Sequence, residues 1–137
     1  MVKRIESVEP GNKREWGKMD SGQMMAHCCY AMQLALGETK LKRSFLGRII
    51  GPMIKKSYLS EKPFKPNNPT SPEFLMTEPK DFEKGKAHLL VLIKKLHEGG
   101  EAGATKHSHG FFGHLTPAQW GQTQWKHLDH HLRQFNA

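Results

Sequence analysis

The stretch from Thr116 to Phe135 most constrains how this chain can fold, because it has the features of a single amphipathic helix. Thr116 is a favourable N-cap, Pro117 suits the first helical position, and Gln119 stands where a capping box requires it. At 100° per residue an apolar stripe follows, made of Trp125, Leu128, Leu132 and Phe135. The opposite side carries Lys126, Asp129 and Arg133. The sequence therefore predicts a helix over 116–136 that packs on one side.

Two histidines of this helix, His127 and His131, lie on one side of the apolar stripe. They are about 40° apart around the axis and one turn apart along it. Two imidazoles so placed can chelate one metal ion, as in other helical His-x-x-x-His sites. Gln124, Gln134 and Trp120 fall on the same side and are candidates for pocket or supporting roles. The pattern alone leaves open that the histidines are hydrogen-bonded structural residues.

A capping box of Asp20 and Gln23 predicts a second helix that runs to Leu36, where Gly37 ends it. On this helix His27 lies at the edge of the apolar stripe, which makes it the third metal-ligand candidate. Gln23 itself and Tyr30 are further candidates for pocket roles. His130 of the last helix falls near −60°, at the polar margin, and is expected to have at most an orienting role.

The remaining segments predict an all-α chain with one long connection. Helical spacing marks residues 43–59, with a kink or break expected at Gly51-Pro52, and residues 80–97. Five prolines between 62 and 80 predict a crossover loop with little regular structure, and such loops often border functional sites. His109 lies in a Gly- and His-rich stretch before the last helix. It belongs either to a surface loop or to a pocket rim.

Composition narrows the classes of protein further. A length of 137 residues predicts a single domain spanning 1–137, with no apolar run long enough to cross a membrane. Without a secretory leader, a cytoplasmic location and no membrane partner are expected. The two cysteines, Cys28 and Cys29, are adjacent and read as buried thiols rather than a disulfide.

The net charge of +8 gathers in one basic region, whose members are Lys40, Lys42, Arg43, Arg48, Lys55, Lys56, Lys62 and Lys65. Such a region suits an anionic partner or is simply a solvated helix face. Aromatic residues are not interleaved for base stacking, so nucleic acid is not expected as a partner.

Two motifs together resemble the DinB/YfiT-like superfamily. Residues 16–19 (WGKM) followed by 23–27 (QMMAH) are similar to its second-helix signature, and 127–134 (HLDHHLRQ) is similar to the end of its last helix. Residues 109–116 (HGFFGHLT), running into Trp120 and 126–131 (KHLDHH), resemble one branch classed as a domain of unknown function. Gly110 stands where that branch often has proline. The similarity covers most of the chain.

The resemblance implies a four-helix bundle with a long crossover loop and a three-histidine site for a divalent metal. Carried over by motif, the ligands are His27, His127 and His131, and zinc or nickel suits such imidazole donors. The core helices would be 20–36, 80–97 and 116–136, with 43–59 alongside. The first helix is short here, and apolar surface at Met24, Met25, Met32, Phe45 or Ile49 would then be covered in a homodimer.

For function, the resemblance includes thiol-dependent transferases and metal-dependent hydrolases, and the residues leave open whether this chain is an enzyme. The leading hypothesis is a low-molecular-weight thiol that attacks an electrophilic small molecule at the metal. The alternatives are hydrolysis by an activated water and a non-catalytic, stress-linked binding module that uses the basic region. Neither a Ser-His-Asp pattern nor a phosphate-binding glycine loop is present in the sequence.

Overall fold

The chain is helical, as the sequence predicts. The computed structural model describes residues 1–42 and 44–137. In chain order the elements are α1 (Val2–Glu6), α2 (Ser21–Leu36), α3 (Phe45–Tyr58), the 3-10 turn η1 (Pro72–Phe74), α4 (Phe82–Gly103) and α5 (Pro117–Gln134). Within the described residues, no helix combines the length and apolar character that a membrane-crossing segment needs.

The helix ends follow the local capping signals. Asp20 accepts the backbone N–H of Gln23 while the Gln23 side chain accepts that of Asp20, so the expected capping box is complete. Thr116 and Gln119 make the same reciprocal pair at the start of α5. Gly37 ends α2 at φ 75°, in the left-handed region that glycine enters without a steric penalty. These predictions are confirmed.

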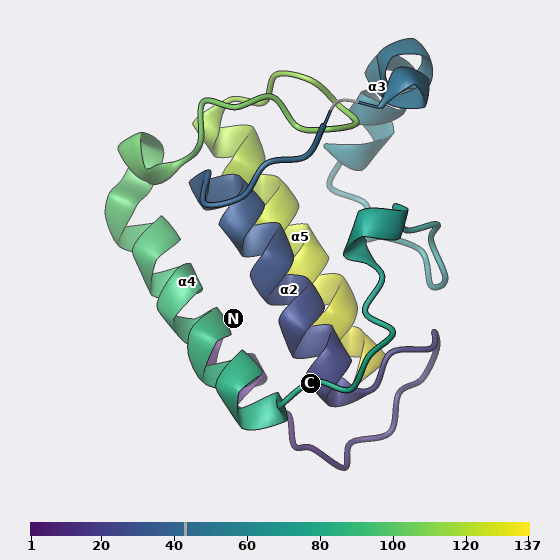
Figure 1. The fold of residues 1–137 in the computed structure, drawn as a ribbon, viewed down its shortest axis with the longest axis vertical. Helices are drawn as coiled ribbons and strands as arrows, with labels where there is room; N and C mark the ends of the chain where they lie inside the picture. The colour runs from purple at the N-terminus through teal and green to yellow at the C-terminus, as the bar shows by residue number, and fades with distance from the viewer. Residues whose placement is uncertain (43) are drawn as a thin grey trace.

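Three helices, α2, α4 and α5, lie side by side and form the core (Figure 1). The main hydrophobic cluster combines α2 methionines with leucines of α4 and α5; its most buried members include Met24, Met25, Leu89 and Leu132. The helices α2 and α4 approach closely at Gly85, where an added Cβ would lie 3.0 Å from the Cβ of Met25. Cys29 donates its Sγ–H to the carbonyl of Gly85 over 3.4 Å.

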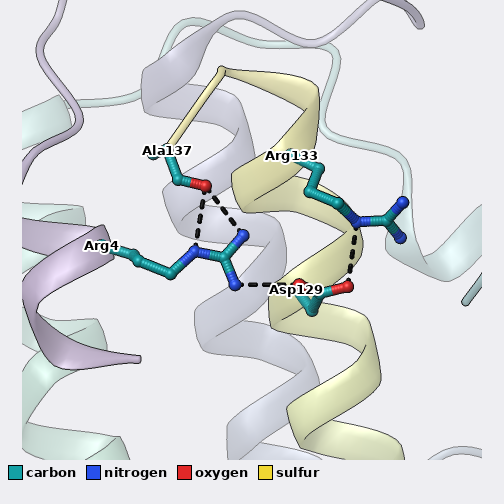
Figure 2. Close-up of polar contacts among 4 residues, drawn as sticks. All are labelled: Arg4, Asp129, Arg133 and Ala137. Atoms are coloured by element: carbon teal, nitrogen blue, oxygen red, sulfur yellow. Dashed lines mark hydrogen bonds and ion pairs between the residues drawn. The ribbon is translucent and has the colours of Figure 1, made fainter.

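The short helix α1 is joined to the last turns of α5 by one arginine (Figure 2). Nη1 of Arg4 lies 2.8 Å from Oδ1 of Asp129, and its Nε and Nη2 donate to the carbonyl of Ala137 over 3.0 and 2.8 Å. Arg133 donates to the other carboxylate oxygen of Asp129 over 2.9 Å. Burial opposes ionisation of Asp129, but its hydrogen bonds and the two positive charges outweigh this, so its pKa is lowered.

Helix α3 stands apart from the bundle, at the upper right of Figure 1. It continues through Pro52 as one helix, so of the kink or break expected at Gly51-Pro52 the break does not occur. Gly47 and Gly51 form its inner side, where an added Cβ at either position would collide with the backbone of Phe111. Its opposite, apolar side is exposed.

Several expectations about packing are wrong. Met24, Met25 and Met32 are buried in the core and offer no surface for a partner. Trp125, expected in the apolar stripe, is 57% exposed and lines an open groove between α4 and α5. Lys126, expected on the polar side, is buried and donates to the carbonyls of Tyr58 and Ser60 over 2.7 and 2.5 Å.

Helix α4 also runs beyond the expected end at residue 97. It extends to Gly103, with helical geometry interrupted at Gly100, whose φ is 52°. The expected crossover loop between α3 and α4 is present, and the single turn η1 is its regular element.

Candidate metal centre

Three histidines meet between α2 and α5. His27 comes from α2, and His127 and His131 come from adjacent turns of α5. One ring nitrogen from each can be chosen so that all three lie within 4.8 Å of one another. The periodicity of each helix places its own histidines on the inner side, and the packing of α5 against α2 brings the two sets together. We call these residues the triad.

Hydrogen bonds fix the tautomers of two triad members. Nδ1 of His27 lies 2.9 Å from the carbonyl oxygen of Phe74, which only accepts, so this nitrogen carries the proton. Nδ1 of His131 likewise lies 2.8 Å from Oε1 of Gln134. Each contact leaves the Nε2 lone pair of its ring free to face the triad. A carbonyl or carboxylate that holds the outer nitrogen is typical of histidines that bind metals.

The third member, His127, has a different environment. Its Nε2 lies 2.8 Å from Nε2 of His27, and its Nδ1 is buried without a hydrogen-bond partner among the described residues. The Nε2 atoms of His27 and His127 therefore share one proton in a hydrogen bond. Without that proton, the lone pairs of both nitrogens could bind a cation. Two nitrogens bound to one tetrahedral zinc lie about 3.3 Å apart, given Zn–N distances of about 2.0–2.1 Å. To bind one zinc ion, the His27–His127 pair would have to open by about 0.5 Å, and the widest pair of ligand atoms, now up to 4.8 Å apart, would have to close by about 1.5 Å.

The triad is held neutral. Burial is the main cause in all three rings: it lowers the pKa of His27, brings that of His131 to about 3, and holds that of His127 well below its usual value. The neighbouring imidazoles lower it further, because each would repel a second positive charge. Neutral imidazole is the form that binds metals, so these rings need not lose a proton to solvent before binding.

The family comparison bears on this centre. The family described as "Protein of unknown function (DUF1569)" matches residues 1–137. The chain belongs to this family. Neither the curated proteins nor the solved structures give a match. The family description carries no ligand or reaction, so the chemistry of this DUF1569 protein must be argued from its own residues.

The crossover loop covers the triad of this DUF1569 protein. The ring of Phe74 stands edge-on to His27 at 5.7 Å and to Tyr30 at 5.1 Å, between ring centroids. The loop is fastened to α2 by Gln23, whose Nε2 donates to the carbonyls of Thr77 and Glu78 over 3.1 and 3.3 Å. Tyr30 and Gln23 therefore contact the loop that covers the triad. Phe74 is missed by sequence analysis, although the proline-rich loop was expected to border a site.

His130 lies in an environment that the sequence did not predict. It is 8% exposed rather than at a polar margin, since Trp16 and Phe64 cover it with ring centroids at 5.6 and 6.1 Å. Burial is the main cause of its lowered pKa. Its ring also stands edge-on to His131 at 5.0 Å, so it packs against one ring of the triad.

Gln134 is the predicted supporting residue with the most direct role. Besides accepting from His131, it donates through Nε2 to the carbonyl of Trp16 over 2.6 Å. It thus links a triad ring to the segment before α2. Trp16 carries part of the resemblance, but its contacts with Gln134 and His130 could not be read from the sequence.

Three other candidates lie elsewhere. Gln124 is buried and lines a groove of about 440 Å³ between α4 and α5, without a partner for its Oε1 among the described residues. Trp120 packs in a small cluster with Ala35. Nδ1 of His109 accepts the backbone N–H of Phe111 over 3.1 Å, and burial lowers its pKa to about 4. His109 therefore organises a turn, not the triad.

Proposed function

We propose that this protein is a DinB-like bundle that binds one divalent ion, zinc or nickel, through His27, His127 and His131. The observation that carries the proposal is the convergence of three neutral imidazoles, of which two are buried and have their outer nitrogens already hydrogen-bonded while the third, His127, is partly buried. Three histidines leave a coordination position for water or substrate, which is the pattern of a catalytic rather than a structural zinc site.

We further propose a transferase in which a low-molecular-weight thiol attacks an electrophilic small molecule at this centre. When bound, the ion supplies positive charge that lowers the pKa of a thiol or a water beside it. The chain itself supplies no nucleophilic thiol: both cysteines are buried, and burial raises the pKa of Cys28 and brings that of Cys29 to about 11. A thiol that reacts here must therefore come with the substrates.

The surroundings of the triad favour this reaction over hydrolysis. In the described part of the chain, the group of potential ligands contains histidines and no carboxylate. The nearest acid on α5, Asp129, is paired with Arg4 and Arg133. A metal lowers the pKa of either nucleophile, but a free thiol starts at a pKa of about 8.5 and water at about 15.7, so without a neighbouring base the thiol reaches its anionic form more readily. The triad residues would hold the ion, and Phe74 would exclude water.

Elemental analysis of gently purified protein tests the metal. We expect about one divalent ion per chain, its loss in His127→Ala and His131→Ala, and retention in His130→Ala with a loss of affinity of about 10–100-fold at most. Protein that contains no metal and takes up neither zinc nor nickel would contradict the proposal. So would a His130→Ala variant that loses the ion while His131→Ala keeps it.

A second assay tests the reaction. Metal-loaded protein is offered small thiols with alkylating or epoxide electrophiles, and the thioether product is measured with and without a chelator. We expect metal-dependent product with at least one thiol. Turnover of esters or amides without any thiol would instead support the hydrolase.

A further inference from the structure

Helix α3 presents an apolar face that no described part of the chain covers. Its most exposed members are Phe45 (79%), Met53 (75%), Ile49 (62%) and Leu46 (57%). At 100° per residue these side chains, with Ile54, span about half of the helix circumference. Scattered exposed apolar residues are ordinary, but a face of this width that no polar residue interrupts between Phe45 and Ile54 marks an interaction surface. We call it the α3 face.

Contacts with the loop before α5 orient this helix with the α3 face outward. The inner glycines, Gly47 and Gly51, let it lie directly on the backbone at Phe111. At its C-terminal end Tyr58 packs on Phe112, with ring centroids 4.3 Å apart. Because the inner side is occupied by these contacts, the apolar side cannot turn inward without breaking them. The exposure is therefore built into the fold.

Positive charge surrounds the α3 face. Between Thr39 and Ser60 the sequence has no acidic residue, and its basic residues are Lys40, Lys42, Arg43, Arg48, Lys55 and Lys56. Arg43 lies outside the described residues. Lys40, Lys42, Arg48 and Lys56 are exposed, while Lys55 donates to the carbonyl of His114. An apolar partner bearing negative charge would satisfy both features.

We propose that α3 binds the surface of an anionic phospholipid bilayer and lies in the plane of the headgroups. Helices that do so combine a wide apolar face bearing Phe and Leu with Lys and Arg around it and modest overall hydropathy. Helix α3 lies at the edge of the molecule, away from α2, α4 and α5, where a membrane surface could meet it (Figure 1). This proposal concerns a different surface from the triad and does not depend on metal binding.

The same features argue against other occupants. In a dimer formed through this face, two α3 helices would lie together. All the charged residues of each helix are basic, and like charges in contact are unfavourable. A helix that docks into the groove of a partner protein usually does so through anchors at i, i+3, i+4 and i+7. The α3 face is wider than such a stripe. The homodimer expected from Phe45 and Ile49 stays a prediction, and the experiment below includes it as an outcome.

Vesicle cosedimentation of the full chain tests the proposal. Vesicles of equal parts phosphatidylglycerol and phosphatidylcholine are compared with vesicles of phosphatidylcholine alone, at low and high salt. We expect binding to the anionic vesicles that weakens with salt, because surface charge contributes to it. The double variant Phe45→Glu/Met53→Glu should lose about tenfold or more in partitioning. Both side chains are exposed, so the variant should keep the helical circular dichroism of the parent.

A matched control places the same charge elsewhere. Val91 on α4 is 62% exposed and lies outside the α3 face, so Val91→Glu should bind anionic vesicles as the parent does. The proposal fails if the parent does not bind them or if both variants lose binding equally. It also fails if light scattering shows a dimer that Phe45→Glu/Met53→Glu dissociates while lipid binding is absent. Single-stranded RNA binding that survives this variant, without lipid binding, would overturn it as well.

Discussion

Replacing Gln134 by methionine should weaken metal binding without touching a ligand. Methionine keeps the length of the side chain but cannot accept the proton of His131 Nδ1 or donate to the carbonyl of Trp16. Loss of a hydrogen-bonded partner behind a metal-binding histidine costs about 10–100-fold in affinity, which is about 1.4–2.8 kcal/mol. The two groups left unpaired should also lower the free energy of unfolding of the metal-free protein by about 2–4 kcal/mol.

Gln124→Met is the matched control, because it makes the same exchange on the same helix at similar burial. Gln124 is 6% exposed and Gln134 is 2% exposed, but Oε1 of Gln124 accepts no hydrogen bond from the described residues. Its replacement should leave zinc affinity unchanged and stability unchanged or slightly higher. Removing a buried acceptor without a partner removes a desolvation cost.

The assay is a competition titration of metal-free protein with zinc and a chromophoric chelator, paired with urea unfolding of the same samples. The reasoning is refuted if folded Gln134→Met binds zinc as tightly as the parent. It is also refuted if Gln124→Met loses as much affinity, since the effect would then be general loosening of α5.

Three further outcomes concern stability, each measured by urea unfolding. Burial depresses the pKa of His109 to about 4, so the unfolded chain binds its proton first, and stability should fall by about 2 kcal/mol between pH 7 and pH 5. His109→Asn should remove that part of the slope, and an unchanged slope would contradict the assignment. Gly51→Ala should destabilise by about 1–3 kcal/mol through collision with Phe111, although helix propensity favours alanine. Gly99→Ala on α4, with no described atom within 4 Å of the new methyl, should stabilise, and a gain at both sites would contradict the packing. Arg4→Ala should cost about 2 kcal/mol, with Arg4→Lys recovering only part, because lysine cannot make the three contacts of Figure 2.

The sequence predicted what is decided locally. The capping boxes at Asp20 and Thr116 depend on residues three apart, so they could be located without knowledge of packing. The three histidines of the triad could also be predicted, because helical spacing and the resemblance pointed to the same residues. The metal and its reaction stay proposals.

What the sequence could not supply are contacts between distant segments. His130 was expected at a polar margin because only its own helix could be considered, yet Trp16 and Phe64 bury it. The carbonyl of Phe74 that holds His27 comes from a loop whose path no periodicity describes. The exposure of the apolar side of α3 could not be predicted either. An apolar stripe in a sequence predicts burial but does not show which partner covers it.

The two adjacent cysteines make opening of the native fold measurable without a label. Cys28 is 1% exposed and Cys29 is 6% exposed, and the latter faces α4 through its contact with Gly85. Disulfide reagents react with the thiolate, which burial disfavours, so the closed molecule should be inert to them. Modification of a thiol therefore requires that α2 separate from α4. The rate of modification under native conditions gives the free energy of that local opening. Comparing these rates with and without zinc would show whether an ion bound between α2 and α5 also stabilises the contact between α2 and α4.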